Sequence, residues 1–221
     1  TGYAMLPLSI SMLIVAPLGG ALSQKFMPKR LIQTGLGINV IALILLRQSI
    51  GLTTEVTDLI LPLTLYGAGM GLVMSQISNM TLSAVPPNEA GEASGVNNTL
   101  RQVGSSLGSA IIGSVLVATL TTSLAKGIQD SPVILPANKT IVSQEVSAQA
   151  SAVEFGGAVK TSTVLTEPEQ AEIKRVANTS TINANRTALL FTVGFTLLAF
   201  LAASQLPKIR NVEQHKGAAA H

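Results

Sequence analysis

The sequence contains no cysteine and no tryptophan, and its two histidines, His215 and His221, both lie near the end of the chain. Without cysteine there is no disulfide framework, no thiol nucleophile and no Cys-ligated metal. Two histidines in the tail supply neither a catalytic pair nor a metal cluster at membrane depth. We therefore predict a protein that is not an enzyme and that holds no cofactor and no metal.

Charged residues are also scarce. They make up 11% of the 221 residues, whereas 47% of the residues are hydrophobic, and the net charge is +3. A soluble domain usually carries roughly a quarter charged residues. The basic excess predicts no nucleic-acid partner, because no basic stripe with interleaved aromatic residues is present. The charges collect instead in the connections between long apolar runs.

Five such runs predict helices that cross a lipid bilayer. A hydrocarbon slab about 30 Å thick is crossed by about 20 helical residues. We therefore predict an all-α integral membrane protein. Residues 1–121 hold four transmembrane helices and residues 187–206 the last one, and residues 207–221 form a cytoplasmic tail. The runs are 3–22, 31–52, 59–85, 102–125 and 187–206.

The charges in the connections predict the orientation. The first connection holds Lys25, Lys29 and Arg30 and no acidic residue, whereas the second holds Glu55 and Asp58 and no basic residue. Lysine and arginine in short connections favour the cytoplasmic side. With five crossings, the first and third connections and the tail then face the cytoplasm.

Residues 122–186 are predicted to form an extracytoplasmic loop. This stretch is polar and rich in Ser, Thr and Ala, so we expect it to be partly disordered. The sequence Thr166-Glu-Pro-Glu-Gln170 is typical of a helix start, and it predicts a short helix through about Ala177.

Polar residues inside the apolar runs are few. Arg47 lies near the outer end of the second run, as a snorkelling anchor or as a substrate contact. Asn39 is expected to satisfy a neighbouring helix. No Asp or Glu lies within any run, so no proton carrier is evident there.

Two glycine pairs predict close helix packing. Gly67 and Gly71, and likewise Gly104 and Gly108, lie four residues apart and so share one helix face. Tyr66, Met70 and Met74 are spaced at about one turn each, which suits either an adaptable substrate cavity or an ordinary core stripe.

Two connections carry a resemblance to a known family. Gly20-Ala-Leu-Ser-Gln-Lys-Phe-Met-Pro-Lys-Arg30 is similar to the cytoplasmic loop motif of the major facilitator superfamily. Gly20, Lys25 and Lys29 match, whereas Gln24 replaces the acidic residue of the motif and Met27 its second glycine.

The segment Ala84–Gly108 more closely resembles the approach to the penultimate helix of the fourteen-helix drug:proton antiporters of the EmrB/QacA type. The resemblance implies helices ten to fourteen, in most of the C-terminal bundle of a major facilitator fold. It implies a loop-motif or gating role for Gly20, Lys25, Lys29, Arg30, Gly91, Ser94, Asn98, Arg101 and Gln102.

The resemblance further implies a multi-pass protein of a bacterial plasma membrane that exports small lipophilic or cationic substrates in exchange for protons. The missing N-terminal helices of the same protein would complete the carrier. Two alternatives stay open: a major facilitator transporter of another small molecule, and a truncated membrane scaffold that transports nothing. Arg101 near a helix start needs a partner, such as Glu92, a helix C-terminus or an acidic residue of the absent half.

Overall fold

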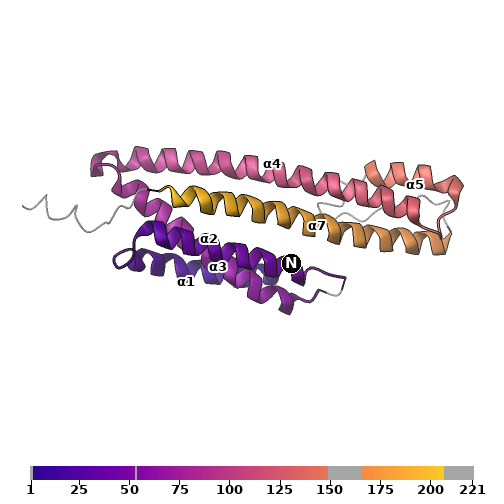
Figure 1. Ribbon diagram of the computed structural model, residues 1–221, viewed down its shortest axis with the longest axis horizontal. Coiled ribbons are helices and arrows are strands. Elements are labelled where there is room, and N and C mark those ends of the chain that lie inside the picture. Colours follow the sequence, from indigo (N-terminus) through magenta and orange to yellow (C-terminus); the bar gives the residue numbers. More distant parts are fainter. Residues whose placement is uncertain (1, 53, 149–165, 207–221) are drawn as a thin grey trace, which may run out of the picture. The chain divides into compact units, whose positions relative to one another are not determined.

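The computed structural model describes residues 2–52, 54–148 and 166–206, and within these ranges it is helical, with no strand. The cytoplasmic tail predicted for residues 207–221 lies outside the described residues. Figure 1 shows the helices in chain order. They are α1 (Gly2–Leu22), α2 (Pro28–Ser49), α3 (Val56–Ser83), the short 3-10 turn Pro87–Glu89, α4 (Ala90–Asp130), α5 (Pro136–Ala148) and α7 (Glu167–Ser204).

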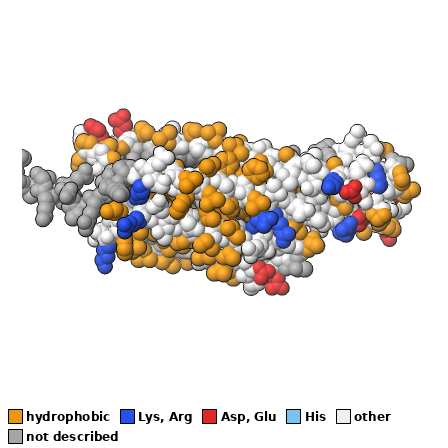
Figure 2. All heavy atoms as spheres, viewed as in Figure 1, with side chains coloured by type: hydrophobic (Ala, Val, Ile, Leu, Met, Phe, Trp, Pro, Cys, Tyr) orange, Lys and Arg blue, Asp and Glu red, His pale blue; other side chains and the backbone are white. Residues whose placement is uncertain are grey.

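Five of these helices are long and apolar enough to cross a bilayer: α1, α2, α3, α7 and α4 with its preceding turn. Their outer surfaces are apolar. Leu13 is 76% exposed, and Leu61 and Leu198 are each 61% exposed. Figure 2 shows hydrophobic side chains spread across the face in view. Such surfaces suit lipid as the solvent, so the prediction of an all-α membrane protein is confirmed.

The chain divides into two compact units. The first comprises Thr1–Ser49, Thr54–Leu107 and Thr192–His221, and the second comprises Ile50–Thr53 and Gly108–Phe191. In the first unit, α1 and α2 both pack against α3. Figure 1 shows these three helices side by side.

Glycines allow that packing. A Cβ at Gly67 of α3 would collide with the Leu8 carbonyl oxygen of α1, and one at Gly71 would lie 3.1 Å from the Met12 carbonyl oxygen. On the other side, a Cβ at Gly35 of α2 would lie 2.8 Å from the Gly69 carbonyl oxygen. Side chains at these positions would push the helices apart.

The second unit has an aliphatic core of its own. Its members come from α4, from α5 and the segment before it, and from α7, and each is at most 7% exposed. Each helix contributes an apolar stripe that it buries against its neighbours. The core residues are Leu120, Leu124, Ile128, Ile134, Val142, Ile173, Val176, Ala177 and Ala184.

The predicted loop between residues 122 and 186 differs from the structure. The α4 helix continues to Asp130, α5 covers Pro136–Ala148, and α7 begins at Glu167 and continues to Ser204 rather than ending near Ala177. The described part of this stretch is therefore more helical than the short helix that the sequence indicated, and partial disorder stays a prediction. Residues 149–165 lie outside the described residues.

One carboxylate fixes the start of α7. Glu169 is 1% exposed and accepts hydrogen bonds from the backbone N–H and hydroxyl of Thr166, at 3.0 and 2.9 Å. It also accepts bonds from the Leu135 N–H at 3.1 Å and the Asn138 amide at 3.2 Å. Glu169 thus caps α7 and ties it to the segment that leads into α5.

Candidate functional site

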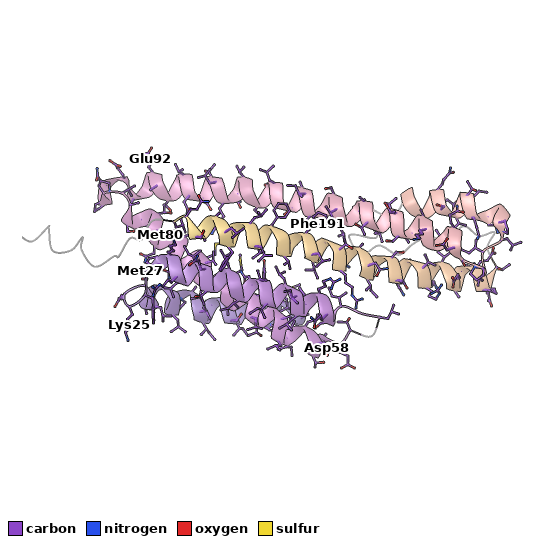
Figure 3. The ribbon with its side chains drawn as sticks, viewed as in Figure 1. Lys25, Met27, Asp58, Met80, Glu92 and Phe191 are labelled. Carbon is purple, nitrogen blue, oxygen red and sulfur yellow. The ribbon has the colours of Figure 1, made fainter. Side chains whose placement is uncertain are left out.

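The connection of residues 23–27 joins α1 to α2, and the basic residues of the predicted loop motif lie in it and in the start of α2. Gly20 lies in the last turn of α1, and no described atom of another segment lies within 4 Å of where a Cβ would stand. Lys25 is exposed at the connection (Figure 3). Lys29 and Arg30 lie in the first turn of α2, behind Pro28 at the first helical position.

Lys29 makes a long-range contact. Its ammonium donates hydrogen bonds to the carbonyl oxygens of Ser204 and Leu206, the latter at 3.0 Å. These carbonyls lie at the C-terminal end of α7. A residue of the predicted motif therefore meets the end of the last membrane helix.

A buried polar layer lies where α1 ends against α3. Gln76 is fully buried, and its Nε2 donates to the Gly19 carbonyl oxygen at 2.7 Å. One turn along α3, Asn79 donates to the Ser23 hydroxyl at 3.1 Å, and Ser23 donates to the Gly20 carbonyl oxygen at 2.6 Å. These amides hold the motif end of α1 onto α3. The sequence pattern did not single them out, although two amides three residues apart in an apolar run were a usable signal.

Two buried polar atoms of α2 have no hydrogen-bond partner among the described residues. They are Asn39 Oδ1 and Arg47 Nε. The Asn39 oxygen lies instead against Gly69, where a Cβ would collide with it. The expectation that the Asn39 side chain satisfies a neighbouring helix is therefore wrong for its oxygen.

The structure brings together three predicted site residues. Arg101 of α4 donates to the Asn98 side-chain oxygen at 3.2 Å and to Met74 Sδ of α3 at 3.7 Å. Glu92 is not its partner among the described residues, because the Glu92 side chain projects outward from the start of α4 (Figure 3). A gating candidate, Arg101, thus touches a cavity candidate, Met74.

The remaining α4 candidates are not brought together with these. Ser94 and Gln102 are not in contact with Arg101 or Met74 through any hydrogen bond that the described residues make. No described atom lies within 4 Å of where a Cβ would stand at Gly91, Gly104 or Gly108. The pair Gly104 and Gly108 therefore differs from Gly67 and Gly71, which lie against α1.

Tyr66, Met70 and Met74 are half-buried on α3. The glycines of α3 that approach α1 and α2 are Gly67, Gly71 and Gly69. At about 100° per residue, the Tyr66–Met70–Met74 stripe lies on a further face of α3.

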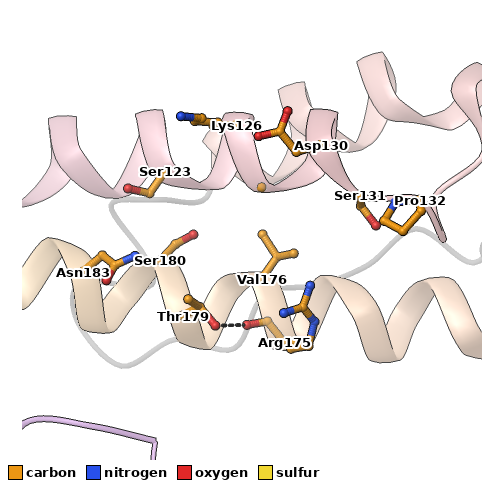
Figure 4. Close-up of a pocket in the computed structure, with 11 residues that line it drawn as sticks. Ser123, Lys126, Asp130, Ser131, Pro132, Arg175, Val176, Thr179, Ser180 and Asn183 are labelled. Carbon is orange, nitrogen blue, oxygen red and sulfur yellow. Dashed lines mark hydrogen bonds between the residues drawn. The ribbon is translucent and has the colours of Figure 1, made fainter.

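A groove of about 340 Å³ lies in the second unit between α4 and α7 (Figure 4). It involves none of the predicted site residues. Val176 of α7 packs closely on Gly127 of α4 there, since a Cβ at Gly127 would lie 2.5 Å from Val176 Cγ1. Lys126 and Asp130 are among the residues that line the groove. The groove is accordingly shallow and offers no enclosed binding site.

Comparison with known proteins finds a family match over the first part of the chain and no similar solved structure. The sequence model of the family described as Major Facilitator Superfamily matches residues 1–109. No solved structure matches the chain.

Three curated relatives carry transport or resistance names. Multidrug resistance protein Stp of Mycobacterium tuberculosis is 29% identical over 91% of this chain and 36% of its own length. A probable actinorhodin transporter of Streptomyces coelicolor is 30% identical over 57% of this chain and 22% of its own length. A tetracenomycin C resistance and export protein of Streptomyces glaucescens is 32% identical over 54% of this chain and 22% of its own length.

The chain thus spans only about a third of the length of the relative that it matches most extensively among these three. The relatives are bacterial, and the apolar helices are those of a multi-pass membrane protein. The match over residues 1–109 and these relatives make the chain similar to membrane transporters of the Major Facilitator Superfamily.

Proposed function

We propose that this chain is the C-terminal part of a proton-coupled exporter of lipophilic, often cationic compounds, of the fourteen-helix type. The observation that carries the proposal is the similarity to a multidrug resistance protein over 91% of the chain. The export and resistance names of two further relatives support it. Two bundles rocking about a midplane site would supply alternating access.

The α3 stripe of Tyr66, Met70 and Met74 is the proposed wall of the substrate path. Methionine is flexible and polarisable, so it adapts to apolar ligands of varied shape. Arg101 lies on the Met74 end of this stripe. Its guanidinium would repel a cation at that position, so substrate and Arg101 would compete for the same place. Arg101 is therefore proposed to gate the path, with Asn98 holding it in the state described here.

Proton coupling requires a group that titrates in the membrane. The five apolar runs contain no Asp or Glu, so we propose that the carrier carboxylate belongs to helices outside this chain. The alternatives, a carrier of another small molecule and a non-transporting scaffold, are separated from export by measuring transport. We expect no enzymatic activity.

Efflux of a fluorescent lipophilic cation from cells that express the full-length protein tests the proposal. Expressing cells should retain several-fold less dye than empty cells, and a proton uncoupler should restore retention. Arg101→Gln should lose most of the efflux, because the gate loses its charge. The matched control, Lys126→Gln in the last turns of α4, should transport normally. Equal retention in expressing and empty cells would remove drug export as the function.

A further inference from the structure

Lys29 caps the C-terminus of α7. The last carbonyls of a helix have no partner within that helix, and a cation beside them is stabilised by the helix dipole. The Lys29 ammonium occupies this place on the Ser204 and Leu206 carbonyl oxygens. Both partners belong to the first compact unit. Lys25, four residues earlier, is exposed and makes no such contact with the described residues.

Arg186 makes the corresponding contact within the second unit. Its Nη2 and Nε donate to the Ile50 carbonyl oxygen, at 2.6 and 3.0 Å. Ile50 is the first residue after α2. A guanidinium with two N–H groups on one carbonyl oxygen supplies a strong, oriented contact.

The distance between the two contacts along α7 is close to the thickness of the hydrocarbon part of a membrane. From Arg186 to Ser204 is a step of 18 residues (204 − 186), or about 27 Å at about 1.5 Å each. The hydrocarbon slab is about 30 Å thick. No charged residue lies between these two positions. Cations at the two ends can keep their charged groups at the interfaces.

We infer that Lys29 and Arg186 are positioning residues that fix the two ends of the membrane-crossing part of α7, each by binding backbone carbonyl oxygens. Lys29 binds the end of α7 from the first turn of α2, and Arg186 binds the chain just beyond the last turn of α2. Lys29 is then a holding contact rather than a moving gate, although it lies in the predicted loop motif. The inference does not depend on what the protein transports.

Hydrogen exchange of the full-length protein in lipid nanodiscs, read by mass spectrometry, tests it. Lys29→Met keeps the apolar stem and removes the charge, so exchange at residues 201–206 should rise several-fold. Lys29→Arg should restore slow exchange there. Lys25→Met, the matched control in the same connection, should leave it unchanged. Arg186→Met should instead speed exchange around residues 48–52, and Arg186→Lys should restore part of the protection.

The test depends on whether each substitution speeds exchange only around its own contact. Each charge removal should speed exchange around its own carbonyl partners and leave exchange around the other contact as it was. If Lys29→Met gave the same exchange at residues 201–206 as Lys25→Met, the capping role would be wrong. If either substitution loosened all helices alike, the effect would be global unfolding, and the positioning role would again be overturned. This experiment does not measure dye efflux. Failure of the positioning role can therefore be told apart from failure of the export proposal.

Discussion

Gly67 shows how a single missing side chain sets a helix contact. A Cβ there would collide with the Leu8 carbonyl oxygen, which is backbone and cannot move away alone. Gly67→Ala should therefore destabilise the protein by about 1–3 kcal/mol, the usual cost of overpacking.

Thermal unfolding of the full-length protein in detergent measures this effect. Gly37→Ala is the matched control, because Gly37 lies in α2 and no atom of another segment lies within 4 Å of where its Cβ would stand. The control should unfold near the wild-type temperature. Equal losses in the two variants would show that the α1–α3 approach is not limited by Gly67.

Glu169 gives the second unit a defined response to acid. Hydrogen bonds from the Thr166 N–H, the Leu135 N–H, the Thr166 hydroxyl and the Asn138 amide lower its pKa from 4.5 to about 2. Glu169 lies in the first turn of α7, outside the apolar part of that helix. A lowered pKa stabilises the fold above pH 4.5, and this contribution disappears as pH falls from about 4.5 to about 2.

Hydrogen exchange at residues 131–140, corrected for its intrinsic pH dependence, should therefore speed up as the pH falls through this window. Glu169→Gln should already exchange faster at pH 7 and should respond little to acid. Glu167→Gln, a control on the same turn, should behave like the wild type because Glu167 is exposed. An unchanged acid response in Glu169→Gln would contradict the capping role.

The lengths of α4 and α7 show what the sequence pattern predicted and what it missed. Absence of charge predicted the apolar part of each helix, and the Thr166–Gln170 pattern predicted the start of α7 at Glu167. These patterns did not predict how far α4 and α7 continue beyond their apolar parts. No proline interrupts the chain between Pro87 and Pro132, and neither proline nor glycine occurs between Pro168 and Gly194. The absence of these helix-breaking residues indicates long helices, and the prediction did not use it.

The contacts of the candidate site were less predictable than the helices. Gln76 and Asn79 were visible as amides, but their partners on α1 depend on how the helices pack. Lys29 and its partner Ser204 lie 175 residues apart, so no local pattern links them. The contact of Arg101 with Met74 likewise joins two helices.

The extension of the helices can be tested by labelling. The α4 helix has 41 residues, about 62 Å of helix, or about twice the hydrocarbon thickness. Lys126→Cys in the full-length protein, stripped of other cysteines, should react with a membrane-impermeant maleimide added outside intact cells. Ser114→Cys, three turns earlier, should react at least tenfold more slowly. Rapid labelling of residue 126 from the cytoplasmic side alone would reverse the proposed orientation.

The chain as a whole is about a third of the length of the multidrug resistance relative. In the proposed account, its five membrane helices form one side of a carrier whose other side and proton-binding carboxylate lie elsewhere in the protein. A rocking carrier needs both sides. Expression of residues 1–221 alone should therefore give membrane-inserted protein without transport.

Transport by the purified full-length protein in liposomes is the most direct test. With an imposed pH gradient, the vesicles should accumulate a fluorescent lipophilic cation against its concentration gradient, and an uncoupler should collapse the accumulation. Vesicles that hold the protein but take up no more cation than protein-free vesicles, with or without the gradient, would contradict the account.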